Sequence, residues 1–492
     1  MSPELVFIVI AGYFLLLLSI SYFTSRNANS ETFFTGDRQS PWYLVAFGMV
    51  GASLSGITFI SVPGEVGNSQ FTYLQFVLGF IPGYAFIALV LMPLYYKLNL
   101  VSIYGYLEQR FGFYAYKTGA FFFLLSRVIG ASLRLFIVAG VLHIAFFRAL
   151  GLPFWLTVVV AIALIWLYTF RGGIKTIVWT DTLQTFFMLA SLVVSILLIK
   201  NELDLSLGQL VSVIQESDMS RVFVWDWQEP TNFFKQFIAG AFIAIVMTGL
   251  DQDMMQKNLT IKTLKGAQKN VLWFTVILVF ANILFLSLGA LLYIYANEIG
   301  FAIPERSDNL FPALAVNQFQ VYAGVIFLLG IIAAAYSSAD SALTALTTSF
   351  CVDFLGIGRK RDEIRDAAKE RIDKRTRKQV HIMFSFILLV VILIFNYIND
   401  ESVIMAVYRV ATYTYGPLLG LYAFGLYTKW QVKDHFIPWV AILSPLICIM
   451  LDLNSEVWFN GFKFGFFILI INGAITFLGL FLIRDRTSST AA

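Results

Sequence analysis

A cluster of hydroxyl and carboxyl side chains interrupts the apolar segment 318–350. Ala334, Ser337, Ser338 and Ser341 follow helical spacing, and Asp340 lies among them. An ionisable residue inside a bilayer is costly, so it normally binds or moves an ion or a solute. Hydroxyl and carbonyl oxygens suit a hard cation such as Na⁺. The segment is therefore predicted to bind a cation, and Asp340 is the first functional candidate.

A second carboxylate is predicted at a similar depth. Asp181 lies near the start of the apolar segment 176–199, and at about 1.5 Å per residue it is only one or two turns inside the membrane. Asp181 and Asp340, together with Ser341, could neutralise one or two monovalent cations. Alternatively, Asp181 pairs with Lys175 or caps its helix near the N-terminus.

Three arginines are also predicted within the membrane, Arg127, Arg134 and Arg409. A guanidinium group forms a two-pronged contact with a carboxylate, so each arginine could bind an anionic substrate. Each could instead pair with an aspartate or a carbonyl as a structural contact. Several polar and aromatic residues could also line a pocket: Thr72, Gln75, Tyr408, Tyr413 and Tyr415.

These residues must be positioned by membrane helices. The chain of 492 residues is 59% hydrophobic and 13% charged, with a mean hydropathy of +0.77, which excludes an ordinary soluble protein. Windows of roughly 20 apolar residues predict thirteen transmembrane helices in a single membrane domain, 1–492. The windows are 5–24, 43–67, 71–98, 116–149, 153–170, 176–199, 233–250, 270–297, 318–350, 379–398, 403–427, 435–452 and 462–483.

The distribution of charge predicts the orientation of these helices. The four lysines between Lys257 and Lys269, and the basic segment from Arg359 to Lys378, are expected in the cytoplasm. The acidic segment 201–232 is expected outside, where it forms an amphipathic helix at the membrane surface or a disordered loop. The N-terminus is then outside and the C-terminus is cytoplasmic. The first span has Glu4 and no basic residue before it, so it is expected to be a retained helix rather than a signal peptide.

Two of the predicted spans contain interruptions. Residues 48–58 carry three glycines and three hydroxyl groups, and the segment 239–249 carries Gly240, Thr248 and Gly249. Paired broken helices in corresponding halves are typical of inverted-repeat transporters, in which unwound backbone binds ions and substrate. Small residues also allow close helix packing. Close packing is the favoured role of Gly48 and Gly64, whereas binding of ions or substrate is the favoured role of residues 51–58.

Other classes of protein lack support in the sequence. Two cysteines and three scattered histidines predict neither a disulfide framework nor a metal cluster. The net charge of +4 is explained by cytoplasmic loops and calls for no nucleic-acid partner. No nucleophile and base pair indicates an enzyme, and no cofactor or obligate protein partner is expected. A membrane sensor or receptor module, the alternative from a different class, would be expected to continue into a signalling domain, but only a short tail follows Leu482.

Four motifs, taken together, resemble the sodium/solute symporter family over about residues 5–430. They are Gly105-Tyr-Leu-Glu-Gln-Arg-Phe-Gly112, Gly172-Gly173 through Trp179-Thr180-Asp181 and Gln184, Asp251-Gln252 with Gln256-Lys257, and the Ala-Ala-Tyr-Ser-Ser run that ends at Ser338. The resemblance implies the architecture of the leucine transporter. An extra helix, 5–24, would precede two inverted repeats, 43–200 and 233–427, and two accessory helices, 435–483, would follow.

The resemblance also implies ligands for Na⁺. The family's conserved sodium site would comprise the carbonyls of Gly51, Leu54 and Ala334 and the hydroxyls of Ser337 and Ser338. Members similar to sialic-acid carriers hold a second sodium, for which the matching residues here are Asp181, Ser337 and Ser341. The expected serine before Ser341 is replaced by Asp340, which could strengthen a second cation site or make it a proton site.

The substrate is predicted to be a small organic anion, such as a monocarboxylate or a sialic acid. Residues that bind sugar in the sugar-carrying branch fall here at Ser53, Ile57 and Thr58, so a hexose site would be unusual. The chain is therefore expected to carry out Na⁺-coupled symport into the cell across a bacterial inner membrane, with Na⁺ as coupling ion and the solute and lipid bilayer as its partners. A sodium- or proton-coupled sugar or polyol symporter is the alternative. The substrate-binding candidates are Ser53, Thr58, Gln75, Arg127, Arg134 and Arg409.

Overall fold

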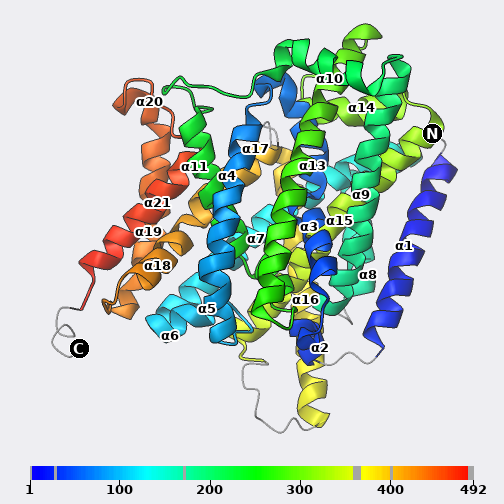
Figure 1. Ribbon diagram of the computed structural model, residues 1–492. Helices are drawn as coiled ribbons and strands as arrows, with labels where there is room; N and C mark the ends of the chain where they lie inside the picture. Colours follow the sequence, from blue (N-terminus) through cyan, green and yellow to red (C-terminus); the bar gives the residue numbers. More distant parts are fainter. Residues whose placement is uncertain (1–2, 27–29, 170–172, 358–366, 399–402, 486–492) are drawn as a thin grey trace.

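Apolar helices that cross most of the molecule dominate the computed structural model (Figure 1). It describes residues 3–26, 30–169, 173–357, 367–398 and 403–485. Within these ranges the pairing of extended chain is limited to a single bridge between Val432 and Arg484. An all-helical structure is expected because a helix satisfies its own backbone hydrogen bonds in lipid.

Ten helical stretches in the described residues are long and apolar enough to span a bilayer, or eleven if one bent pair counts as a span. These spans are formed by α1 (Pro3–Ser25), α3 (Trp42–Ser69), α4 to α5 (Tyr73–Lys97), α7 (Phe113–Leu142), α9 (Ile174–Glu202), α13 (Leu264–Glu298), α15 (Val321–Ser349) with the turn after it, α16 (Ala367–Ile398), α19 (Ile437–Leu453) and α21 (Ile468–Leu482). The bent pair joins Phe233–Gly249, which comprises α11 (Phe233–Ala244) and one further turn, to α12 (Gln252–Asn258).

The predicted count of thirteen spans is not confirmed. The predicted window 153–170 corresponds to the 16-residue helix α8 (Phe154–Thr169). The window 403–427 is divided at Tyr415 into α17 (Val403–Thr414) and α18 (Gly416–Tyr427), each of 12 residues. A 12-residue helix is only about 18 Å long, which is short of a hydrocarbon core of about 30 Å. Hydropathy alone did not reveal this break.

The break predicted in the second span is confirmed. Ser55 in α3 has φ 44° and ψ 171°, so the helix is interrupted at this residue. The other predicted break lies in the bent pair, where α11 and α12 meet at 68°. Gly240 is not part of that break. A Cβ at Gly240 would lie 2.0 Å from the Phe76 carbonyl oxygen, so this glycine permits close packing against α4.

Gly48 and Gly64 also serve close packing, as the sequence favoured. A Cβ at Gly48 would lie 3.0 Å from the Cβ of Asp181, and one at Gly64 would lie 2.3 Å from the Ser307 carbonyl oxygen. Both neighbours belong to other elements, so a larger side chain would push the helices apart.

Helices of the first predicted repeat pack against helices of the second. α3 packs along α13 and α4 along α11, while α7 packs along α17 and α9 along α15. Such pairing is expected if the chain contains two repeats of five helices and each helix of one repeat packs against a helix of the other. The repeat boundaries 43–200 and 233–427 stay predictions. α19 and α21 pack beside α18 at one edge of the bundle, and α1 lies at the other edge (Figure 1).

The acidic segment 201–232 contains the predicted helix. α10 (Leu207–Glu216) begins with a capping box between Ser206 and Gln209, and it buries Leu210 and Ile214. In Figure 1 it lies at the same end of the bundle as α14 (Leu310–Asn317), opposite to α6 (Gly105–Arg110). A helix is therefore present there rather than a disordered loop.

Candidate functional site

The serines that the sequence singled out lie where three long helices meet. α15 packs against both α3 and α9, and Ser337, Ser338, Asp340 and Ser341 on α15 are all buried. The break in α3 faces this part of α15. A Cβ at Gly51 would lie 3.3 Å from the Ser337 hydroxyl oxygen, and one at Gly56 would lie 3.5 Å from the Ala335 Cα. The predicted carbonyl and hydroxyl ligands therefore belong to neighbouring surfaces.

The chemistry of these residues fits Na⁺. A helix that ends at Ser55 leaves the carbonyls of its last turn without intrahelical partners, and Gly51 and Leu54 lie in that turn. On the opposite side, Ser338 donates its hydroxyl hydrogen to the Ala335 carbonyl at 3.1 Å. Ser337 donates to Asp181 at 2.7 Å. Both hydroxyl oxygens keep lone pairs that a hard cation can use.

Glycine is required at position 51. The Gly51 N–H donates to the Thr185 hydroxyl oxygen on α9 at 3.0 Å. A Cβ at this position would lie 2.2 Å from the same oxygen. Thr185 thus holds the end of the broken helix, and any side chain at residue 51 would displace it.

Asp181 is the carboxylate at the centre of the neighbouring polar cluster. Its Oδ1 accepts the hydrogen bond from Ser337, and its Oδ2 accepts one from Ser341 at 3.3 Å. The ammonium of Lys257 lies 2.7 Å from the same Oδ2. Asp181 therefore pairs with Lys257 on α12, whereas Lys175 pairs with Asp37 at 3.1 Å. The sequence predicted a possible ion pair for Asp181 but named the wrong lysine.

Asp340 is held by a different set of groups. Tyr168 on α8 donates its hydroxyl hydrogen to Oδ2 at 2.7 Å, and the Ser341 N–H donates to Oδ1 at 2.6 Å. The side chain is completely buried. Asp340 and Asp181 thus share Ser341 as a neighbour, but each has its own hydrogen-bond partners.

A small cavity of about 60 Å³ lies beside the break in α3. Six of its 21 described lining residues come from α3, and three of these, Ser53, Ser55 and Thr58, contribute hydroxyl groups. The other lining residues are aromatic, apolar, basic or, at Thr248 and Asn282, polar and uncharged, and none of those described is acidic: Ala52, Leu54, Ile57, Tyr73, Phe80, Tyr84, Arg127, Arg134, Ile243, Ala244, Met247, Thr248, Met254, Leu278, Asn282, Ile404, Val407 and Tyr408.

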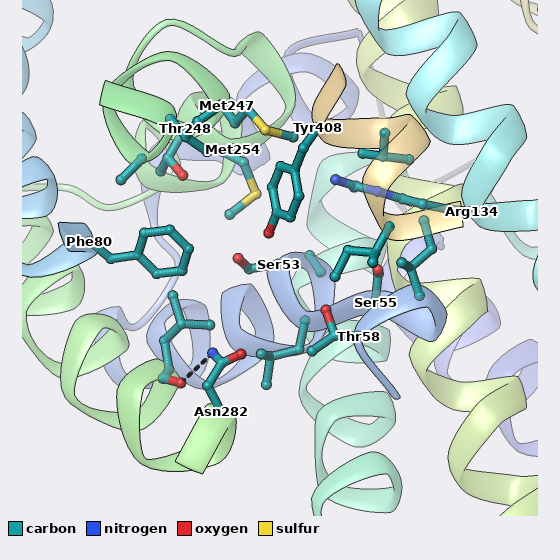
Figure 2. A pocket seen from close by; sticks show the side chains of 18 of the residues that line it. Ser53, Ser55, Thr58, Phe80, Arg134, Met247, Thr248, Met254, Asn282 and Tyr408 are labelled. Atoms are coloured by element: carbon teal, nitrogen blue, oxygen red, sulfur yellow. Dashed lines mark hydrogen bonds between the residues drawn. The ribbon is translucent and has the colours of Figure 1, made fainter. Parts of the chain in front are cut away.

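Three side chains on the cavity wall, those of Arg127, Arg134 and Asn282, have buried polar atoms without a hydrogen-bond partner among the described residues. The Nε of Arg134 has no hydrogen-bond partner among the described residues, and neither has the Oδ1 of Asn282. The amide nitrogen of Asn282 donates to the Leu278 carbonyl at 2.8 Å, which fixes the orientation of the group. Figure 2 shows Arg134 and Asn282 on different sides of the cavity, with Ser53 between them.

The two buried arginines on α7 have different electrostatic partners. Arg127 lies 3.8 Å from Asp251 and also contacts the carboxylate of Asp253. Within the described part of the chain no acidic group forms an ion pair with Arg134. Arg127 is therefore neutralised by the protein, whereas Arg134 has no ion-pair partner in the described part of the chain.

The acidic partners of Arg127 belong to the bend between α11 and α12. Asp251 caps α12 by accepting hydrogen bonds from the N–H groups of Asp253, at 2.9 Å, and Met254, at 3.3 Å. Tyr415, at the break between α17 and α18, also donates to Asp251. The bend between α11 and α12, the junction of α17 and α18 and the helix α7 thus meet through buried polar contacts.

Two of the substrate candidates lie away from the cavity lining. Gln75 accepts from the Val224 N–H at 3.2 Å and donates to the Thr231 carbonyl at 2.9 Å, so it ties α4 to the segment before α11. Arg409 is exposed on α17. Ser53, Thr58, Arg127 and Arg134 do line the cavity, as does Tyr408. Sequence reasoning missed Asn282, because a single polar residue in an apolar helix gave no spacing signal, and it named Thr248 only as part of the interruption in 239–249.

Within the described residues, no group of three or more His, Cys, Asp or Glu side chains could hold a metal ion. Together, the broken helices, the buried hydroxyl and carboxyl groups where α15 packs against α3 and α9, and the adjacent cavity are typical of membrane transporters of the inverted-repeat type. The family model described as the sodium:solute symporter family matches residues 33–434, and the chain belongs to this family.

Relatives and solved structures agree with this assignment. The chain is 24% identical to the sodium/sialic acid symporter SiaT of Proteus mirabilis, over 95% of this chain and 94% of the relative. It is 22% identical to the sodium/sialic acid symporter NanT of Aliivibrio fischeri, over 92% and 89%. A solved Na⁺-coupled sialic acid symporter, in a substrate-bound outward-open state with a novel Na⁺ site, shares the fold with a TM-score of 0.80 at 19% identity, covering 98% of this chain and 99% of that one.

Proposed function

We propose that this protein is a secondary transporter that couples the inward movement of Na⁺ to the uptake of a small organic anion. The family assignment and the sodium-coupled relatives, which include a mouse sodium-coupled monocarboxylate transporter, support this class of function. No comparison supports a sugar or polyol carrier or a sensor module. The multi-pass helical architecture supports a location in the cell membrane, which for this compact chain is the bacterial inner membrane, with the N-terminus outside.

The observation that carries the proposal is the position of the break in α3. The same turn contains Gly51, where a Cβ would come within 3.3 Å of the Ser337 hydroxyl oxygen on α15, and Ser53, whose side chain lines the cavity. An ion bound between α3 and α15 would therefore fix the backbone that shapes the solute site. Without the ion, α3 would lose this ion-mediated link to α15. The difference in solute affinity between the ion-bound and ion-free states is the coupling free energy that symport requires.

Arg134 is the proposed ligand for the carboxylate of the solute. A charge-assisted hydrogen bond contributes about 1.5–3 kcal/mol, and this guanidinium has no competing acidic partner among the described residues. Asn282, with a free acceptor, and the hydroxyls of Ser53 and Thr58 suit a solute that carries hydroxyl or N–H groups. A hydroxylated carboxylate such as a sialic acid would use both sides of the cavity, whereas a simple monocarboxylate would use only the Arg134 side.

Uptake into liposomes that contain the purified protein tests this function. Labelled sialic acid, lactate and glucose would each be supplied with an inward Na⁺ gradient, and then with K⁺ in its place. We expect uptake of a carboxylate solute that requires Na⁺ and is lost in Arg134→Gln. Uptake of glucose but of neither carboxylate would contradict the assignment of an anion, and equal uptake with K⁺ would contradict sodium coupling.

A further inference from the structure

We propose that the ammonium group of Lys257 permanently occupies the second cation position, so that this protein binds one Na⁺ with its solute rather than two. The inference rests on the proposed sodium-coupled function and specifies its stoichiometry. It concerns the residues for which the family resemblance implied a second sodium, Asp181, Ser337 and Ser341.

The ammonium group of Lys257 lies where a second Na⁺ would bind Asp181. Its nitrogen lies 2.7 Å from Asp181 Oδ2, and both side chains are 1% exposed. A hard cation bound to a carboxylate oxygen sits about 2.3–2.6 Å from it. An added Na⁺ on Oδ2 would therefore lie within a few ångströms of another positive charge, in a place that water does not screen. The ammonium and a second Na⁺ exclude each other.

The remaining capacity of Asp181 is also used. Ser337 donates to Oδ1 at 2.7 Å and Ser341 donates to Oδ2 at 3.3 Å. These are the hydroxyl groups that a sodium ion would share with the carboxylate. With their hydrogens directed at Asp181 and the ammonium beside it, the carboxylate is fully compensated without any bound ion.

Lys257 has few alternatives to this position. Its contact with Asp181 is an ion pair, and in the described residues its nitrogen has no hydrogen-bond acceptor of good geometry. The backbone that carries it is fixed on both sides. Gln256 donates to the Phe34 carbonyl at 2.8 Å and to the Thr348 hydroxyl at 3.1 Å, and Asn258 accepts from Asn270 at 2.6 Å. Removing a buried lysine from its partner would leave an uncompensated charge, so the pair is expected to persist.

Asp340 does not supply an alternative second site. Its two oxygens accept hydrogen bonds from the Tyr168 hydroxyl and the Ser341 N–H. Neither contact requires a metal ion. Replacement of the family's serine by Asp340 therefore adds a carboxylate that the protein itself solvates, while Lys257 holds the position next to Asp181.

The test is a count of bound sodium ions. Equilibrium binding of labelled Na⁺ would be measured on the purified full-length protein in detergent, together with the Hill coefficient of Na⁺-driven uptake. We expect one Na⁺ per protein and a Hill coefficient near 1 for the native chain. Lys257→Ala is expected to bind two Na⁺, because Asp181 then needs a new partner. Lys257→Arg keeps the positive charge and is expected to bind one.

Controls distinguish the possible failures. Lys175→Ala removes a lysine whose partner is Asp37 and should leave the count at one. If Lys257→Ala does not fold, the double variant Asp181→Asn with Lys257→Gln removes both charges together and should still bind one Na⁺. Two ions bound by the native chain, or the loss of an ion in the double variant, would overturn the inference. Absence of any Na⁺ binding in the native chain would instead refute the proposed function.

Discussion

The hydroxyl group of Ser337 on α15 donates a hydrogen bond of 2.7 Å to the carboxylate of Asp181 on α9. Ser337 also faces Gly51, where a Cβ would come within 3.3 Å of its oxygen. One side chain therefore connects the proposed sodium ligands on α3 with the buried ion pair between Asp181 and Lys257. Binding of Na⁺ and the state of this ion pair are consequently expected to influence each other.

Ser337→Ala should raise the Na⁺ concentration for half-maximal uptake at least about tenfold, because a loss of about 1.4 kcal/mol corresponds to that factor. The change removes an oxygen ligand and a hydrogen bond to Asp181. Uptake at varied Na⁺ concentration measures the effect. Ser349→Ala is the matched control, since Ser349 lies on the same helix and donates to Asp353 instead. An unchanged Na⁺ dependence in Ser337→Ala would exclude this serine as a ligand.

Arg134→Gln should weaken binding of the anionic solute by roughly 10- to 100-fold, which corresponds to the loss of a charge-assisted hydrogen bond of about 1.5–3 kcal/mol. Binding of Na⁺ alone should be nearly retained, because Arg134 lines the solute cavity and is not one of the proposed sodium ligands. Thermal stabilisation by Na⁺ and by solute, measured separately, checks both statements. A variant that loses its response to Na⁺ but keeps its response to solute would contradict this role.

Arg127→Gln, unlike Arg134→Gln, should mainly lower the stability of the folded protein. Its removal leaves the carboxylates of Asp251 and Asp253 buried without their positive partner, which costs about 3–5 kcal/mol in comparable cases. The melting temperature of Arg127→Gln should therefore be well below that of Arg134→Gln. Equal melting temperatures would show that the two arginines do not divide the structural and binding roles as described.

Gly240→Ala should destabilise the contact between α11 and α4. A Cβ at this position would lie 2.0 Å from the Phe76 carbonyl oxygen, and forcing atoms into a packed interface costs about 1–3 kcal/mol. Gly130→Ala is the control, because nothing lies within 4 Å of a Cβ there. This second change should be neutral or stabilise α7 by up to about 1 kcal/mol. Unfolding temperatures of the two variants give the comparison.

Asp308 should make stability depend on pH. It lies outside the spans in the short helix η7 (Ser307–Asn309), where burial raises the pKa of its carboxyl group, although the nearby Ser61 hydroxyl and the hydrogen bond from the Val403 N–H lower that pKa. A raised pKa in the folded state favours the protonated form. This contribution to stability is complete below the ordinary pKa of aspartate, and it is lost as the pH rises through the raised value.

Asp308→Asn should therefore reduce the fall in melting temperature as the pH increases through that range. The side chain would keep its acceptor for the Val403 N–H, which is 3.2 Å from Asp308 Oδ2, but would no longer titrate. Asp226→Asn changes an exposed acid and should retain the native pH profile. A profile unchanged in Asp308→Asn would show that this carboxyl group does not contribute.

Several features of the protein follow from its sequence alone. The composition requires a helical membrane protein, because only helices satisfy the backbone in lipid over segments of this kind. The hydroxyl groups of Ser337 and Ser338 and the carboxylate of Asp340 mark α15, since such groups are rare in a span. The glycines and hydroxyls between Gly51 and Thr58 predict the break that the structure places at Ser55. These are local properties of composition and spacing.

Other features depend on tertiary structure. Arg127 and Arg134 are equivalent in the sequence. Only the approach of α12 to α7 places Asp251 and Asp253 beside Arg127, whereas Arg134 faces the cavity without such partners. The sequence offers nearby Lys175 as one possible partner of Asp181, but helix packing brings Lys257 to it instead. Long-range pairing of charges is set by which helix faces meet. Which helix faces meet depends on the packing of the whole bundle, and a local sequence pattern does not determine it.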